Sequence, residues 1–337
     1  MSNCLLDIQP HKVSRDLSGY ITYIYGKGKT GKTTLASQMD NALLIAFERG
    51  YNALPGVFPY DVTSWSQFKK DVLKNLAKEE TKQRFKCVVI DTIDIAAALC
   101  EKYMCNMLGI SEIGEGGYAV NGWVKTKREF EETLRSIAQM GYAVFFISHD
   151  KEKLHKNPDG TEYTQIIPSL SNTYNEIVKN MADIYGYAHS VTREDGSNGV
   201  MLTLRSFDGS VDTGCRFKYI TPEIPFNYES LSNALIEAIE KEAEMHDNQY
   251  VTDESIQPIT EKTYDFDALF EEFNTLVKRI QNNVSPTEFR EVWSVKIVEI
   301  TDKYLGKGKK VGELNPSQAE QLSLIVSDLI DAVNEGL

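Results

Sequence analysis

One short segment near the N-terminus constrains this chain more than any other. Its eight residues match the pattern G-x-x-x-x-G-K-[ST] in full, and they are Gly26, Lys27, Gly28, Lys29, Thr30, Gly31, Lys32 and Thr33. The apolar run Ile21–Tyr25 leads into the segment, and helical periodicity follows from Thr33 to about Asp40. A strand, a glycine-rich turn and a helix in this order place backbone N–H groups around an anion. The segment therefore predicts a phosphate-binding loop; the alternative, a surface turn rich in Gly and Lys, is disfavoured by the flanking pattern.

The residue types in this loop predict what each would bind. The Lys32 ammonium would bridge the β- and γ-phosphates of a nucleoside triphosphate, and the Thr33 hydroxyl would ligate Mg²⁺. Thr34 completes the predicted nucleotide-binding set, which runs from Gly26 to Thr34. The expected cofactors are therefore ATP and Mg²⁺.

A second metal ligand is expected where another strand ends. The apolar run Phe85–Ile90 is followed by Asp91. Because open α/β sheets bind their ligands at the carboxyl ends of the strands, Asp91 would hold the Mg²⁺ shell through water. Asp94 lies three residues further on, and we expect it to cap a helix rather than to bind metal.

Apolar runs of strand length alternate with helical periodicity over residues 1–246. Strands are predicted at Ile21–Tyr25, Ala42–Phe47, Phe85–Ile90, Tyr142–Ser148, Ile184–His189 and Val200–Arg205. Longer helices are predicted at Trp65–Ala77, Ala96–Leu108, Trp123–Met140 and Tyr228–Met245. This alternation indicates βαβ units, and so an α/β fold with a mostly parallel central sheet flanked by helices.

The pattern changes after residue 246. Residues 247–263 are polar and acidic, contain Pro258 and lack periodicity, which predicts a linker. Residues 264–337 are predicted to form a small all-helical domain. Its second helix would begin at Ser285–Glu288, a capping box with Pro at the first helical position, and its third at Asn315–Pro316.

Composition disfavours several classes of protein. The formal net charge of −13 differs from the basic balance of a protein that coats nucleic acid. Residues 237–267 hold ten Asp and Glu against two Lys, so this stretch alone carries −8 and the remainder is close to balanced. The five cysteines show no C-x-x-C spacing, which disfavours a zinc site or a disulfide framework. With no leader-like or membrane-length apolar run, we expect a cytoplasmic protein without a membrane partner.

Hydrolysis requires a group that activates water. Two interpretations of the sequence, a partition-type ATPase and a RecA-like core, differ in the residues that complete the catalytic site. Lys27 lies five residues before Lys32, where partition-type ATPases carry a signature lysine. Those proteins follow the next strand with an aspartate-rich segment, whereas here Glu48 follows Ala42–Phe47. A Glu at this strand end resembles the RecA-like core, in which it is the catalytic base. We therefore expect a RecA-like P-loop NTPase core with Glu48 as the base, and a partition-type ATPase is the alternative.

The next strand end carries Ser148 and His149. In RecA-like cores a polar residue there senses the γ-phosphate, so His149 is predicted to pass the nucleotide state to a DNA-binding loop; an ordinary polar strand end is the alternative. Residues 151–180 interleave basic and aromatic side chains: Lys151, Lys153, His155, Lys156, Tyr163, Tyr174 and Lys179. This composition suits a path for single-stranded DNA, although a solvated charged loop would share it.

A basic pair, Arg216 and Lys218, comes near the end of the core. RecA-like rings and filaments insert an Arg or Lys from a neighbouring subunit into the nucleotide site, where it stabilises the charge of the transition state. Arg216 is predicted to act in this way; a basic pair on the surface is the alternative.

The order of these parts resembles short RecA/RadA-like ATP-binding proteins of phages, within the AAA-like ATPases, that are linked to single-strand annealing and recombination. The shared segments over residues 10–240 are YG-x-x-x-TGKTTLA, LLI-x-x-E-x-G, VVIDT-x-D, FFISH-D-K and G-x-R-F. The resemblance implies ATP binding, a homo-oligomer, and a role beside single-stranded DNA or its binding protein in the host cytoplasm. We expect an ATPase that couples nucleotide state to DNA handling in phage recombination or replication. A nucleotide-gated, non-catalytic scaffold or annealing protein that acts through a protein partner is the alternative.

Overall fold

The computed structural model of residues 1–337 describes residues 9–115, 117–156, 160–192, 195–254 and 264–336. The chain divides into two compact units, Met1–Thr260 and Glu261–Leu337. Each unit buries its own hydrophobic residues. The first unit contains the phosphate-binding loop and is described first.

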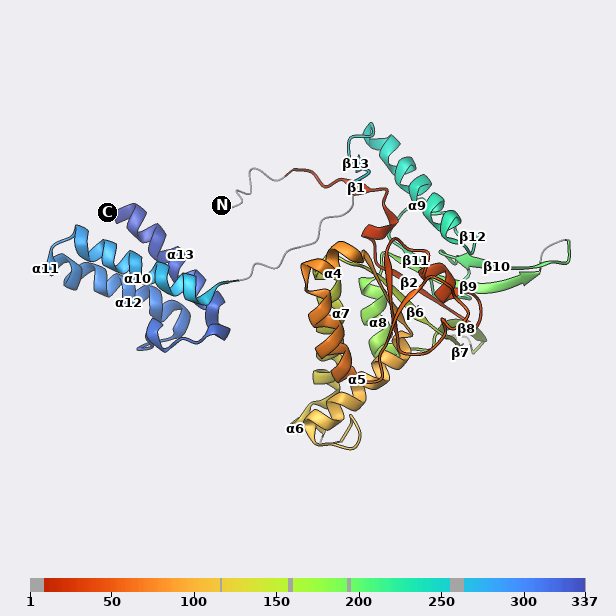
Figure 1. Ribbon diagram of the computed structural model, residues 1–337, viewed down its shortest axis with the longest axis horizontal. Coiled ribbons are helices and arrows are strands. Elements are labelled where there is room, and N and C mark those ends of the chain that lie inside the picture. The colour runs from red at the N-terminus through yellow and green to blue at the C-terminus, as the bar shows by residue number, and fades with distance from the viewer. Residues whose placement is uncertain (1–8, 116, 157–159, 193–194, 255–263, 337) are drawn as a thin grey trace. The chain divides into compact units, whose positions relative to one another are not determined.

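A nine-stranded sheet forms the centre of the first unit, with the strand order β12-β10-β9-β2-β6-β5-β3-β4 and β11 beside β9 (Figure 1). Its strands are β2 (Thr22–Gly26), β3 (Ala42–Ala46), β4 (Phe58–Asp61), β5 (Cys87–Asp91), β6 (Ala143–Ser148), β9 (Ile184–Thr192), β10 (Asn198–Thr203), β11 (Gly214–Cys215) and β12 (Glu223–Pro225). The pairings among β9, β2, β6, β5, β3 and β4 are parallel, and those of β10, β11 and β12 are antiparallel. The predicted mostly parallel α/β sheet is thus confirmed.

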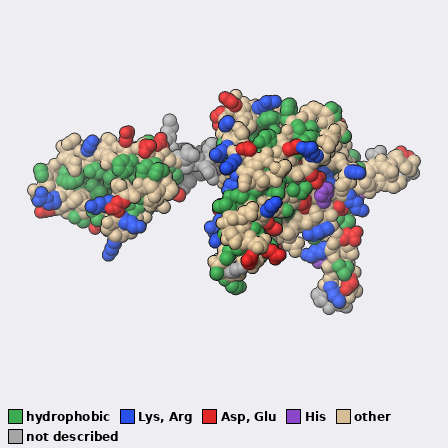
Figure 2. Space-filling view, turned by 60° about the horizontal axis from the view of Figure 1, so that its bottom comes forward, with side chains coloured by type: hydrophobic (Ala, Val, Ile, Leu, Met, Phe, Trp, Pro, Cys, Tyr) green, Lys and Arg blue, Asp and Glu red, His purple; other side chains and the backbone are tan. Residues whose placement is uncertain are grey.

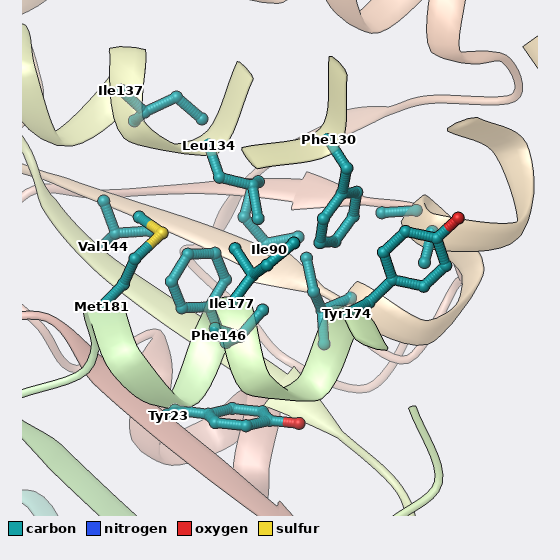
Figure 3. Packing of buried hydrophobic residues seen from close by; sticks show 14 of the residues in the cluster. Tyr23, Ile90, Phe130, Leu134, Ile137, Val144, Phe146, Tyr174, Ile177 and Met181 are labelled. Carbon is teal, nitrogen blue, oxygen red and sulfur yellow. The ribbon is translucent and has the colours of Figure 1, made fainter. Parts of the chain in front are cut away.

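Helices cover both faces of this sheet. They are α1 (Lys32–Ala36), α2 (Trp65–Gln67) continuing through a π-helical turn into α3 (Lys74–Leu76), α4 (Glu79–Arg84), α5 (Ile93–Leu108), α6 (Gly117–Val120), α7 (Gly122–Gln139), α8 (Asn172–Met181) and α9 (Tyr228–Ala243). One face packs against α2–α3, α5, α7 and α8, and the other against α1 and α9. Figure 3 shows the first of these layers, in which side chains of α7 and α8 meet those of β5 and β6. Because both faces are covered, the central strands are buried along their whole length, which explains their continuous apolar runs.

The segment predicted as a charged loop, residues 151–180, has regular structure. It forms an antiparallel hairpin of β7 (Asp150–Lys156) and β8 (Glu162–Pro168), followed by α8. Tyr174, predicted to face a DNA strand, is buried on α8 against Phe130, with ring centroids 4.8 Å apart. The prediction for Tyr174 is therefore wrong, because the apolar spacing of α8 turns this ring into the core.

Part of the predicted linker also has regular structure. Val251–Thr252 forms β13, which pairs in parallel with β1 (Val13–Ser14). Residues 255–263 of that linker lie outside the described residues. The sheet contacts of the first unit thus extend past residue 246.

The second unit consists of helices around its own core. They are α10 (Phe266–Asn283), α11 (Pro286–Glu288) continuing through a π-helical turn into α12 (Ser294–Leu305), and α13 (Ala319–Gly336). Ser285 caps α11 by accepting a hydrogen bond from the Glu288 N–H (3.2 Å), and Asn315 caps the turn that leads into α13. Among the described residues of the whole chain, no helix combines the length and apolar character needed to cross a membrane.

Candidate functional site

A cavity of about 650 Å³ opens where β2, β3, β5 and β6 end. The loop after β2, Glu48 after β3, Asp91 at the end of β5 and His149 after β6 all line it. Parallel strands deliver their carboxyl ends to one edge, so residues distant in sequence converge there. The cavity therefore brings together most of the predicted site.

Backbone geometry shapes the phosphate-binding loop. Lys29 and Gly31 adopt positive φ angles of 67° and 91°, which turn the chain back toward α1. At Gly26 an added Cβ would lie 2.2 Å from the carbonyl oxygen of Ala188 on β9, so only Gly permits this close approach. Gly31 is the N-cap of α1 and provides no side-chain hydrogen bond to its first turn. The amides of that turn thus lack a side-chain acceptor from their cap.

Lys32 is the buried cation of this loop. Its ammonium donates to the carbonyl oxygens of Gly26 (2.7 Å) and Lys27 (2.8 Å) and lies 3.4 Å from the Thr30 hydroxyl. Burial lowers the pKa of Lys32, while the Asp91 carboxylate acts in the opposite direction. A phosphate would replace weak neutral acceptors with an anion, which is the stronger partner for a buried ammonium.

Thr33 and Asp91 form the predicted metal pair. The Thr33 hydroxyl donates to the Asp91 carboxylate at 2.7 Å. Asp91 is only 2% exposed, and burial raises its pKa to about 6 against the opposing hydrogen bond from Thr33. A hydroxyl and a carboxylate are hard oxygen donors of the kind that Mg²⁺ binds, and its charge would offset the cost of keeping Asp91 ionised.

Thr92 supplies an independent indication that the cavity is built for a ligand. It lines the cavity and is completely buried, yet its hydroxyl has no hydrogen-bond partner in the described structure. Thr92 is also the N-cap of α5 without making a capping hydrogen bond. A buried hydroxyl without a partner costs free energy, on the order of 1–3 kcal/mol. A phosphate oxygen or a metal-bound water would satisfy it, so the residues present fit Mg·ATP. Sequence reasoning missed this residue, because the motif signals only the Asp before it.

Glu48 and His149 lie next to each other in the lining of the cavity. The Glu48 carboxylate lies 3.6 Å from His149 Nε2, and both side chains remain more than a third exposed. Two N–H groups, of Phe47 and Glu48, donate to the Asp91 carbonyl oxygen at 2.7 and 3.2 Å. The backbone thus fixes Glu48 next to the predicted metal ligand, while its carboxylate stays accessible to water.

Asp94 does not cap α5 as predicted, because Thr92 occupies that position. Its carboxylate instead accepts hydrogen bonds from the hydroxyls of Ser148 (3.0 Å) and Ser169 (2.6 Å) and from the N–H of His149 (3.3 Å). Ser148 ends β6, and Ser169 follows the last residue of β8. Asp94 thereby connects the edge of the cavity to the base of the β7–β8 hairpin, a role that needs tertiary proximity and leaves no sequence signal.

Lys27 does not line this cavity. Its carbonyl accepts a hydrogen bond from Lys32, and the residue lines a second, separate cavity. In the described structure it therefore does not reach the nucleotide site of its own chain. Its predicted contribution to nucleotide binding is limited here to the backbone.

Arg216 lies at the opposite end of β2 from the loop. Its guanidinium pairs with Asp183 (3.2 Å) and donates to the Asn180 carbonyl (2.9 Å), and Asp183 accepts from the Ile21 N–H just before β2 begins. The Lys218 ammonium lies 4.9 Å from the ring centroid of Tyr219. Neither cation lines the cavity of its own chain, and action in a neighbour's site stays a prediction.

A phosphate-binding loop on a parallel sheet, with an acid at a neighbouring strand end, defines a P-loop nucleotide-binding domain. Residues 18–217, more than half of the 337-residue chain, match the family model described as AAA domain, and the chain belongs to this family. The chain is also similar to the SPbeta prophage-derived uncharacterized protein YorG of Bacillus subtilis (strain 168). The two are 29% identical over an alignment of 334 positions, which covers 96% of each chain. The predicted AAA-like family is confirmed, and the RecA/RadA-like recombination type stays a prediction.

Proposed function

We propose that this protein is an ATPase that couples the state of bound Mg·ATP to the handling of single-stranded DNA. The observation that carries the proposal is the convergence of Lys32, the Thr33–Asp91 pair and Glu48 on one cavity. A buried cation for phosphate, two oxygen donors for a metal and an accessible carboxylate are the groups that hydrolysis of a phosphoanhydride requires.

The chain's own residues have distinct tasks in this reaction. Lys32 would exchange its carbonyl partners for the β- and γ-phosphates, and Thr33 and Asp91 would hold Mg²⁺. The metal, when bound, neutralises charge on the phosphates. Glu48 would orient the attacking water and accept its proton. Because His149 lies beside Glu48, a change in the hydrogen bonding of Glu48 would also change that of His149.

The β7–β8 hairpin is the proposed DNA contact. Strand alternation and pairing place Lys151, Lys153, His155 and Tyr163 on one face. His155 and Tyr163 stack with ring centroids 5.0 Å apart, and Tyr163 is 42% exposed. This face combines charge for phosphates with a ring for bases. Figure 2 shows that the hairpin projects from the first unit and carries basic as well as acidic side chains, and the sequence of the hairpin makes the basic ones Lys.

The test is steady-state ATP hydrolysis with and without single-stranded DNA. We expect turnover that DNA stimulates and that Lys32→Ala abolishes. Glu48→Gln should lower turnover by about 100-fold or more while Mg·ATP still binds, because general bases contribute roughly 10²–10⁴-fold. Absence of Mg·ATP binding by the wild type would contradict the proposal, and full turnover in Glu48→Gln would contradict the assignment of the base.

A nucleotide-gated scaffold is the second candidate. The pairing of Glu48 with His149 favours it, since a carboxylate engaged by imidazole is a poorer base for water. Tight Mg·ATP binding without turnover would support this candidate and direct the search to a protein partner. The proposal includes a role in phage recombination or replication. It also includes assembly into a homo-oligomer, in which Arg216 would enter the nucleotide site of a neighbouring subunit. The prophage origin of the similar protein supports the phage setting.

A further inference from the structure

A second cavity, separate from the first, also adjoins the phosphate-binding loop. Its volume is about 740 Å³, and it shares no lining residue with the first cavity. Lys27 and Thr30 form the part of its wall that belongs to the loop. The remaining walls come from β8, β9, β10, β12 and the residues after β10. One loop therefore separates two cavities, and both would respond to its conformation.

Aromatic rings from two parts of the chain, β9 and the segment after β10, line this cavity. Tyr187 and His189, on β9, stack with an interplanar angle of 8° and ring centroids 5.3 Å apart. Phe207 follows β10 and is 82% exposed, an unusual exposure for a large apolar ring. Tyr187 is buried at 6% exposed, so a planar ligand in the cavity would cover mainly the rings of Phe207 and His189.

Polar groups for a planar ligand lie beside these rings. His189 Nε2 is 2.9 Å from the Glu223 carboxylate and 3.1 Å from the Thr203 hydroxyl. Ser190 also belongs to the lining, as do the cationic residues Lys27 and Arg205 and the acidic residue Asp208. Aromatic rings for stacking, hydrogen-bonding groups and cationic residues are together the requirements of a base attached to a phosphate.

We propose that this cavity binds a nucleobase. The inference rests on the proposed function only in one respect: the proposed function supplies ATP and single-stranded DNA as the two candidate sources of the base. The preference of the cavity for a base is argued from its own residues. Two sources can supply the base. One is the nucleotide whose phosphates occupy the loop, and the other is a single strand that the β7–β8 hairpin contacts, since Ile166 of β8 also lines the cavity.

Phe207→Ala tests the proposal, because the ring is exposed and its removal leaves the core intact. Phe207→Tyr is the conservative variant that keeps the ring. Met107→Ala is the matched control, since it removes another exposed apolar side chain (65% exposed) that does not line the cavity. Titration calorimetry would measure the affinity of the full chain and each variant for Mg·ATP, Mg·tripolyphosphate and an oligothymidylate.

We expect Phe207→Ala to weaken the binding of one base-containing ligand about tenfold, the usual effect of losing one stacked ring. Phe207→Tyr and Met107→Ala should bind like the wild type, and tripolyphosphate affinity should be equal in all four proteins. A loss confined to Mg·ATP assigns the base to the nucleotide, and a loss confined to the oligothymidylate assigns it to the strand. Unchanged affinity for both, or an equal loss for tripolyphosphate, would overturn the proposal. A wild type that binds neither ATP nor tripolyphosphate would instead contradict the proposed ATPase, and the oligothymidylate titrations would still decide on the cavity.

Discussion

At the scale of single residues, Thr92 gives the sharpest test of the nucleotide site. Its buried hydroxyl has no hydrogen-bond partner among the described residues, so Thr92→Val, which keeps the shape, should leave the free protein equally stable or more stable. If a phosphate or metal-bound water completes this hydroxyl, the same change should weaken Mg·ATP binding about tenfold, since hydrogen bonds to charged groups contribute roughly 1.5–3 kcal/mol. Titration calorimetry and thermal unfolding measure the two effects.

The chain contains a matched control for this prediction. Thr22 is also completely buried with an unpartnered hydroxyl, but it lies at the start of β2, at the far end from the loop. Thr22→Val should therefore affect stability as Thr92→Val does and leave Mg·ATP affinity unchanged, and Thr92→Ser should bind like the wild type. Equal affinities for all four proteins would show that no ligand contacts Thr92.

At the scale of secondary-structure elements, Asp94 joins α5, β6 and the β7–β8 hairpin. Ser169→Ala removes the hydroxyl that donates from the hairpin side at 2.6 Å and leaves the bonds from Ser148 and His149 in place. We expect basal ATP turnover to change less than about twofold and the stimulation by single-stranded DNA to fall several-fold, because a lost bond to a carboxylate costs roughly 1.5–3 kcal/mol.

Ser136→Ala is the control for this change, since its hydroxyl donates to a carbonyl within α7, away from the cavity. A double-mutant cycle of Ser169→Ala with Asp94→Asn should show strong non-additivity if the two residues act through their mutual bond. DNA stimulation that survives intact in Ser169→Ala would mean that the hairpin is coupled by another route.

The elements also show which parts of the molecule the sequence predicts. The six predicted strands all exist, because each is an apolar run buried on both faces or bounded by clear breaks. The edge strand β4 was not predicted, since it is mostly exposed and reads Phe-Pro-Tyr-Asp, with a Pro that is tolerated only at a sheet edge. The sequence predicts a loop where the β7–β8 hairpin lies, because charged residues at successive positions of β7 hide its period of two.

The residues of the candidate site also fall into two groups, those that the sequence predicts and those that it does not. Lys32, Thr33 and Asp91 lie in contiguous motifs whose chemistry depends on local order, and the structure brings them into one cavity. Thr92 and the bonds of Asp94 depend on which side chains meet across strands, which one sequence does not encode as a pattern. Lys27 lines the second cavity and not the nucleotide cavity, and the motif alone does not show this.

At the scale of the whole molecule, the buried hydrophobic clusters of the two units share no described residue. The helical unit is centred on Trp293, which is 3% exposed and packs with residues of α10 and α13. A unit of this size has little stability in reserve. Trp293→Ala should cost it about 3–5 kcal/mol, the usual effect of removing a large buried ring. We expect this loss to unfold the helical unit and leave the nucleotide-binding unit folded.

Calorimetric unfolding of the full chain separates the two units through their ligand response. If Mg·ATP binds the first unit as proposed, it should raise only the transition temperature of that unit, since a ligand stabilises the state that it binds. In Trp293→Ala the transition that does not respond to Mg·ATP should shift down or vanish, while the responsive one keeps its position and its shift. The opposite result would be a single unfolding transition whose temperature rises with Mg·ATP and falls in Trp293→Ala. This result would show that the two units unfold together. Retention of the responsive transition would mean that the first unit draws its stability from the sheet and its two helical layers, and that it does not depend on the C-terminal helices.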